Sequence, residues 1–361
     1  MSGSLISLLI KSTFHYGRRK NVQLRLLSTF EKVCSYNRSK NERLNVLKKV
    51  YSPHLIHKEG TQEWNKLIKS GKIWEDYFRP FEWRAQDYYF QAEYTDFLKA
   101  IDGLKASSKI SSVDILKRLT VGFAQHSCAI EGNTLELGEA QKIWNMLKKN
   151  FSLNDFLKNI DMPLPAPSSL SDKLENEVIE VRNHLLATYF LYNTFYESEH
   201  EIDLDGIKII HRIMLKDTLL ERIELDEDYQ HAGEFRKIEV EAYGSIYTVY
   251  PLPLEVPALM KRFIQFRDES QDSGLHPLII ASRILSTFLH VHPFADGNGR
   301  VGRSIMTLYL IRNGFPPAIF QDIPREEYIS TLFLAQAEKD SIPLYALVVQ
   351  NIFNILMRYQ A

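Results

Sequence analysis

The stretch HVHPFADGNGRVGRS, residues 290–304, places histidine, aspartate, three glycines and two arginines within fifteen positions. It lies between two strongly apolar segments, 276–290 and 302–314, whose composition and period predict helices. The second segment ends in Asn-Gly just before two prolines, as helices commonly do. We therefore expect a loop rich in chemically active side chains between two buried helices.

His292 precedes Pro293, which disfavours the α region at His292, so the first helix should end there and present the imidazole. An unperturbed histidine pKa of about 6.5 suits a general base near neutral pH. Asp296 is a hard oxygen ligand suited to the magnesium ion that accompanies a nucleotide. These positions indicate attack of an alcohol on phosphorus.

The residues after Asp296 suit an anion. Glycine lets a phosphate approach the amides of the first helical turn, which have no partner within the helix. Arg300 and Arg303 lie three apart, face one side and can clamp further phosphate oxygens. Ordinary explanations exist for each part, since DGNG is a common turn and paired arginines often lie on a solvated helix face.

Two other kinds of site are disfavoured. His290 and His292 could bind a metal together, but this pair straddles a helix end rather than sharing one face. The chain has no GxxxxGK[ST] phosphate loop, so it is not an ordinary ATPase.

The stretch resembles the signature of Fic-domain proteins, HxFx[DE]GNGRxxR. The segments HAGEFRK (231–237), PLPLEVPALM (251–260) and REEYISTLFLAQ (325–336) look similar to the surroundings of a Fic core. The resemblance covers about Ser112 to the C-terminus. The matching residues are His292, Phe294, Asp296, Gly297, Asn298, Gly299, Arg300 and Arg303.

This resemblance implies a mainly α fold, a Fic helical bundle with a short β-hairpin flap near the active-site loop. It also implies a protein adenylyltransferase that moves AMP from Mg-ATP to a hydroxyl side chain of a target protein and releases pyrophosphate. The implied roles are base for His292, loop anchor for Phe294, magnesium ligand for Asp296, anion cradle for Gly297, Asn298 and Gly299, and outer-phosphate clamp for Arg300 with Arg303.

A second motif, SCAIEGN at 127–133, resembles the inhibitory-helix motif [ST]xxxE[GN]N of Fic proteins. The resemblance implies that Glu131 pairs with Arg303 and obstructs the γ-phosphate, because a carboxylate competes with phosphate oxygens for the same donors. The alternative is that Glu131 simply ends a surface helix. Ser127, Gly132 and Asn133 complete the motif.

A hairpin signal occurs at 236–253, where apolar residues alternate with charged ones and Gly244 supplies a turn. In the family this hairpin is the flap that holds the target segment, here Ile238, Val240, Ile246 and Tyr247. The alternative is a connecting ribbon.

The bulk composition fits a globular protein of 361 residues without an overall field for nucleic acid or anionic lipid, since 44 basic residues face 45 acidic ones. Two cysteines, Cys34 and Cys128, cannot form a disulfide framework, which suggests a reducing compartment. No segment approaches the length of a membrane-spanning helix. We expect an intracellular protein, cytoplasmic in the first place, with mitochondrial import as the alternative because the first thirty residues are basic and serine-rich.

Along the chain, aromatic residues concentrated between 61 and 105 predict burial, and the text from Ser112 onward predicts helices. We expect a helix to end at Gly132, and Asn133 with Glu136 to cap the next one, roughly 134–147. The expected parts are a basic segment at 1–60, an aromatic helical extension at 61–111, the inhibitory-helix region at 112–160, a Pro/Ser linker at 161–172 and the Fic core at 173–361.

The leading hypothesis is an autoinhibited protein adenylyltransferase that uses ATP and Mg2+ to modify a protein on Ser, Thr or Tyr, with a homodimer as a further hypothesis. Two alternatives stay open. Glu131 could orient a water for removal of AMP from a modified protein, or the chain could bind nucleotide or a partner without catalysis.

Overall fold

A computed structural model describes residues 48, 51, 57–58, 60–74, 85–196, 201–225, 228–240, 249–320, 323–337 and 340–360. The chain divides into two compact units. The first comprises Met1–Ile56 and Glu241–Val249, of which Lys48, Tyr51 and Val249 are described. The second comprises His57–Val240 and Tyr250–Ala361 and contains every element discussed below.

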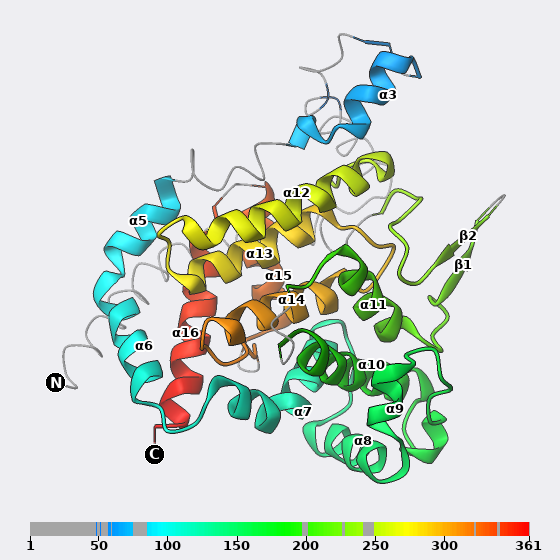
Figure 1. Ribbon diagram of the computed structural model, residues 1–361, viewed down its shortest axis with the longest axis vertical. Coiled ribbons are helices and arrows are strands. Elements are labelled where there is room, and N and C mark those ends of the chain that lie inside the picture. The colour runs from blue at the N-terminus through cyan, green and yellow to red at the C-terminus, as the bar shows by residue number, and fades with distance from the viewer. Residues whose placement is uncertain are drawn as a thin grey trace, which may run out of the picture. The chain divides into compact units, whose positions relative to one another are not determined.

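Two helices form the centre of the second unit, α13 (Pro277–Val291) and α14 (Asn298–Arg312). They pack against one another and run side by side in Figure 1. Every residue of α13 from Leu278 to Val291 is buried. A helix that is apolar on all sides belongs in the core of a large domain, which is where this one lies.

Among the described elements, six helices pack against this pair (Figure 1). Helices α7, α10 and α11 contact α14, whereas α12, α15 and α16 contact α13. These six are α7 (Ser112–Ile130), α10 (Glu175–Leu191), α11 (Leu204–Leu215), α12 (Val256–Glu269), α15 (Arg325–Ala337) and α16 (Ile342–Arg358).

The remaining described helices complete the unit. None of the described helices combines the length and apolar character that a membrane span needs. Toward the N-terminus lie α3 (Gln62–Lys69), η2 (Lys72–Trp74), α5 (Ala85–Glu93) and α6 (Thr95–Ser107). Farther along lie α8 (Leu137–Asn150), α9 (Leu153–Lys158), η3 (Pro167–Ser169), η4 (Tyr192–Tyr196), η5 (Pro253–Glu255) and η6 (Ser270–Asp272).

The connection from α7 to α8 differs from the predicted cap. Helix α7 ends in a Schellman turn, with Gly132 at φ +103° and the Asn133 N–H donating to the Cys128 carbonyl. Helix α8 begins at Leu137, and the Glu139 carboxylate accepts the Glu136 N–H. Asn133 is not the cap of α8, because the side chain turns toward α10 instead.

The predicted mainly α fold with a short β-hairpin is confirmed, but the observed hairpin lies earlier in the sequence. It pairs β1 (Arg222–Glu224) with β2 (Tyr229–His231) in antiparallel register, and Figure 1 shows it extending from the helices of the second unit. In the predicted segment, 236–240 and 249–253 contain no strand, and 241–248 lie outside the described residues.

The predicted burial of the aromatic region 61–105 applies to part of it. Trp64, Trp74 and Phe90 are buried, whereas Tyr88 and Tyr89 are exposed. The rings between 75 and 84 lie outside the described residues, as do Cys34 and the basic segment up to 47.

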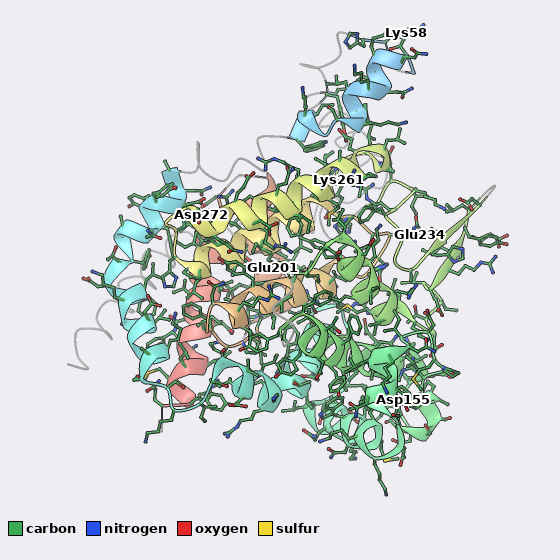
Figure 2. The ribbon with its side chains drawn as sticks, viewed as in Figure 1. Lys58, Asp155, Glu201, Glu234, Lys261 and Asp272 are labelled. Atoms are coloured by element: carbon green, nitrogen blue, oxygen red, sulfur yellow. The ribbon has the colours of Figure 1, made fainter. Side chains whose placement is uncertain are left out.

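Charged side chains lie on the outer helices of the second unit. Figure 2 shows Asp155 on α9 and Lys261 on α12, both exposed, whereas most of the buried side chains are apolar. The charged groups inside this interior are therefore exceptions, and each must have a partner or a function.

Candidate functional site

The loop between α13 and α14 begins where the sequence predicts. Helix α13 ends at Val291, and His292 adopts the left-handed conformation, with φ +49°. Arg236 holds this turn from outside: its Nε donates to the His292 carbonyl at 2.7 Å, and its backbone N–H donates to the Pro293 carbonyl at 2.8 Å. The imidazole is thus placed by a strained turn that a buried guanidinium supports.

The His292 ring has a defined tautomer. Its Nδ1 lies 3.3 Å from the Leu289 carbonyl, which can only accept, so Nδ1 carries the proton and Nε2 the lone pair. Burial, together with the nearby Arg236 charge, lowers the pKa of His292 to about 4, below the ordinary value expected from sequence. The imidazole is therefore neutral near pH 7, the state that a general base requires.

Phe294 and Asn298 fix the rest of the loop. Phe294 is fully buried and stacks on the ring of His211, with centroids 3.8 Å apart and planes at 5°. Nε2 of His211 donates to the Asp296 carbonyl at 3.0 Å, and Nδ1 accepts the Gly233 N–H. The Asn298 amide bonds both the N–H and the carbonyl of Phe294. These contacts give the loop one conformation before any ligand arrives.

The N-terminus of α14 already faces a carboxylate. The helix begins after Gly297, whose φ is +74°. A Cβ added at Gly299 would lie 2.3 Å from Oε1 of Glu131. Unpaired helix amides and the helix dipole favour anions at such a position, and here the anion is the Glu131 carboxylate.

Glu131 is held there by Arg303. The Nη2 of this arginine donates to Glu131 Oε1 at 2.6 Å and to the Ser127 carbonyl at 2.8 Å, and its Nε donates to Ser127 Oγ. Burial alone would raise the pKa of Glu131, but the charge and hydrogen bond of Arg303 outweigh it and lower the pKa. The carboxylate is therefore ionised at neutral pH and forms an ion pair with Arg303 beside the N-terminus of α14.

Arg300 has different partners from Arg303. Its Nη1 lies 2.6 Å from Oε1 of Glu180, and its Nη2 donates to Oδ2 of Asp296 at 3.0 Å. Arg300 is buried, while the side chain of Asp296 is 47% exposed. The two arginines of the motif thus contact different carboxylates: Arg303 contacts Glu131, whereas Arg300 contacts Glu180 and Asp296.

Asp296 is the residue that could hold magnesium. In the part of the chain that the structure describes, no cluster of three metal-ligating side chains occurs. Magnesium normally takes one or two carboxylates and completes its shell with water and phosphate oxygens, so a single exposed carboxylate beside an anion cradle fits this ion. His290 is buried edge-on against Trp74, with ring centroids 5.2 Å apart, and does not join His292 in a metal site.

The four residues of the inhibitory-helix motif come together at the end of α7. Glu131 is the C-cap of the helix, Gly132 makes the turn, and Ser127 contacts Arg303. Asn133 Nδ2 donates to Glu180 Oε2 at 2.8 Å. Among the flap residues, Ile238 accepts from Arg236 through its carbonyl and Val240 is buried, whereas Ile246 and Tyr247 lie outside the described residues.

Several residues near the site were not assigned a role from sequence, His211 among them. Arg236 and Tyr328 occur in segments whose similarity to a Fic core had been noted, and Tyr328 is buried with its ring 5.8 Å from the Arg303 guanidinium. Glu180 occurs between two buried aliphatic residues of α10. A carboxylate at such a position is a weak signal, but burial of a charge usually requires a partner, here Arg300.

Comparison with known proteins agrees with this geometry. Residues 201–310 match the model of the Fic/DOC family. A protein adenylyltransferase Fic from Drosophila grimshawi is 30% identical over 210 residues, which are 58% of this chain and 37% of the relative. One from Culex quinquefasciatus is 28% identical over 240 residues, 66% of this chain and 41% of the relative. This chain thus spans about two fifths of the length of these relatives.

Solved structures share the fold. Fic-1 (residues 134–508) from C. elegans has a TM-score of 0.56 at 22% identity, covering 90% of this chain and 94% of that one. A Fic domain containing signaling protein from Bacteroides thetaiotaomicron has a TM-score of 0.56 at 19% identity, covering 73% of this chain and 96% of that one. The domain that includes the loop after α13 thus matches the Fic/DOC family model over residues 201–310, and its fold is shared with these solved Fic structures.

Proposed function

We propose that this chain is an autoinhibited protein adenylyltransferase, which transfers AMP from Mg-ATP to a hydroxyl side chain of another protein. The observation that carries the proposal is the position of Glu131: its carboxylate lies against Gly299 at the N-terminus of α14 and 2.6 Å from Arg303. A carboxylate trapped by donors for anions marks the place of a phosphate group. The curated relatives named protein adenylyltransferase support the choice of reaction.

The reaction needs few groups from this chain. The acceptor oxygen attacks the α-phosphorus, the bond from that phosphorus to the bridging oxygen breaks, and pyrophosphate leaves. The hydroxyl proton passes to Nε2 of His292, which is unprotonated because Nδ1–H donates to the Leu289 carbonyl. The fixed loop of Phe294 and Asn298 keeps the imidazole in place during this transfer.

Asp296 would hold the magnesium ion through its exposed carboxylate. The ion, when bound, supplies positive charge to the phosphate oxygens. The amides at the start of α14 and the Arg303 guanidinium would bind the triphosphate once Glu131 has left them.

Replacing Glu131 by Gly tests the proposal. We expect the Glu131→Gly chain to incorporate label from α-labelled ATP into itself or a lysate protein roughly 5- to 150-fold faster than the natural chain, the range of typical coupling energies. Glu136→Gly is the matched control, because Glu136 caps α8 without contact to Arg303 and glycine is tolerated at an N-cap. Adding His292→Ala should abolish the label.

The outcomes separate the candidate functions. Absence of label from ATP, GTP, CTP and UTP in the Glu131→Gly chain would refute nucleotidyl transfer and favour a binding protein. Release of AMP from a modified protein by the natural chain, lost on Glu131→Gly, would favour the hydrolase. That alternative has one supporting observation, since an ionised Glu131 with a side chain 32% exposed could accept a hydrogen bond from water.

A further inference from the structure

A chain of three charged groups connects α10 to the catalytic loop. Glu180 of α10 contacts Arg300 at 2.6 Å, and Arg300 contacts Asp296 at 3.0 Å. The Arg300 side chain is 7% exposed and lies between the two carboxylates. Neither Glu180 nor its pairing with Arg300 belongs to the motif that marks the family.

The charges of this group decide what Asp296 can do. Two carboxylates and one guanidinium leave a net charge of −1, and of the two carboxylates Asp296 is the more exposed, at 47% against 20% for Glu180. Without Glu180, Asp296 would be the sole partner of a buried cation among these three groups. Its negative charge would then be neutralised within the protein and would attract an external cation more weakly.

Asn133 holds the Glu180 carboxylate in the orientation that contacts Arg300. The second oxygen of Glu180, Oε2, accepts from Asn133 Nδ2 at 2.8 Å, so Oε1 stays directed at Arg300. Asn133 also donates to the Glu177 carbonyl, which fixes the amide against α10. The carboxylate is therefore pre-oriented before any ligand binds.

We infer that Glu180 is a positioning residue for magnesium: it neutralises Arg300, so that Asp296 keeps the negative charge with which it would bind the ion. This inference rests on the proposed function. Groups that support a metal ligand from behind typically change metal affinity roughly 10- to 100-fold when they are replaced.

The test measures binding rather than turnover. The full chain carrying Glu131→Gly and His292→Ala, which should bind ATP without transferring AMP, is titrated with ATP by calorimetry in EDTA and again with Mg2+. The ratio of the two affinities reports the contribution of the ion. Glu180→Gln in this background should reduce that ratio roughly 10- to 100-fold and leave the affinity in EDTA nearly unchanged.

Glu177→Gln is the matched control. It makes the same charge change one turn earlier on α10, but Glu177 accepts from Thr134 rather than from Arg300. The ratio should therefore stay unchanged. Glu180→Asp retains the negative charge, so its ratio should stay close to that of the background chain.

An unchanged ratio in Glu180→Gln, or an equal loss in Glu180→Asp, would overturn the inference. If the background chain binds no ATP in either condition, the proposed function has failed and the inference falls with it. Circular dichroism checks folding, and Glu180→Ala replaces the Gln variant if that variant does not fold, because it removes the charge without placing an amide donor near Asn133.

Discussion

At the scale of single residues, Gly299 shows how little spare volume the anion site has. A methyl group at this position would lie 2.3 Å from the present place of Glu131 Oε1 and 3.0 Å from an Arg303 nitrogen. In a Glu131→Gly background the clash with the carboxylate disappears, but the methyl still covers the helix amides. Gly299→Ala should then weaken ATP binding by at least about tenfold, the cost of one charge-assisted hydrogen bond.

Calorimetry of ATP binding to the two chains measures this loss. Gly138→Ala is the control, since a Cβ there meets nothing within 4 Å and should leave the affinity unchanged. Equal affinities with alanine or glycine at 299 would show that the phosphate does not use these amides.

Residues of the site could be predicted from sequence where the residues that act together lie close together in the chain. The loop from His292 to Arg303 could be predicted because its residues are contiguous and form one turn followed by the beginning of one helix. The pairing of Glu131 with Arg303 was expected only from the resemblance of SCAIEGN to the inhibitory-helix motif. The partner of Arg300 could not be predicted, since Glu180 approaches from a helix more than a hundred residues away. The pKa of His292 is lower than the ordinary value because the imidazole is buried and, secondly, because Arg236 approaches from a distant segment; neither is apparent from the local sequence.

At the scale of elements, α5 joins the central helices through a buried charge. Asp87 is fully buried, accepts from Arg283 of α13 at 2.8 Å and from the Tyr345 hydroxyl of α16 at 2.6 Å. Removing one partner leaves a buried charge uncompensated, so Asp87→Ala should lower the free energy of unfolding by about 3–5 kcal/mol.

Urea unfolding monitored by circular dichroism measures this change. Asp96→Ala on the exposed face of α6 is the control and should shift the free energy of unfolding by less than about 0.5 kcal/mol. A small effect of Asp87→Ala would mean that α5 contributes little to the stability of the domain.

Helix existence could be predicted better than helix boundaries or contacts. An apolar stripe predicted α7, whereas α13 and α14 were predicted from the strongly apolar composition of their segments, which are buried on all sides. The start of α8 was misplaced because Asn133 has a longer-range partner in α10 that competes with local capping. The buried ion pair of Asp87 could not be predicted from sequence, since the partners of Asp87 lie far along the chain in α13 and α16.

At the scale of the whole molecule, the buried core lies directly behind the arginines of the candidate site. His184 of α10 is fully buried, with its ring 5.3 Å from that of Phe123 in α7. Burial, with the nearby charges of Arg303 and Arg300, lowers the pKa of His184 to about 3. The positive charges of Arg303 and Arg300 therefore oppose protonation of the buried His184 imidazole.

This arrangement makes the folded state sensitive to acid. The folded pKa of His184 lies below the unfolded value of about 6.5, so between these values the unfolded chain binds more protons and stability rises with pH. Its contribution is complete above pH 6.5 and falls as pH decreases, by about 2 kcal/mol between pH 7 and pH 5. Urea unfolding at both pH values measures the decrease in the free energy of unfolding from pH 7 to pH 5. This decrease should be about 2 kcal/mol smaller in His184→Gln than in the natural chain. The exposed His231→Gln on β2 should keep the full loss, and an equal pH dependence in all three chains would contradict the burial of a neutral imidazole at 184.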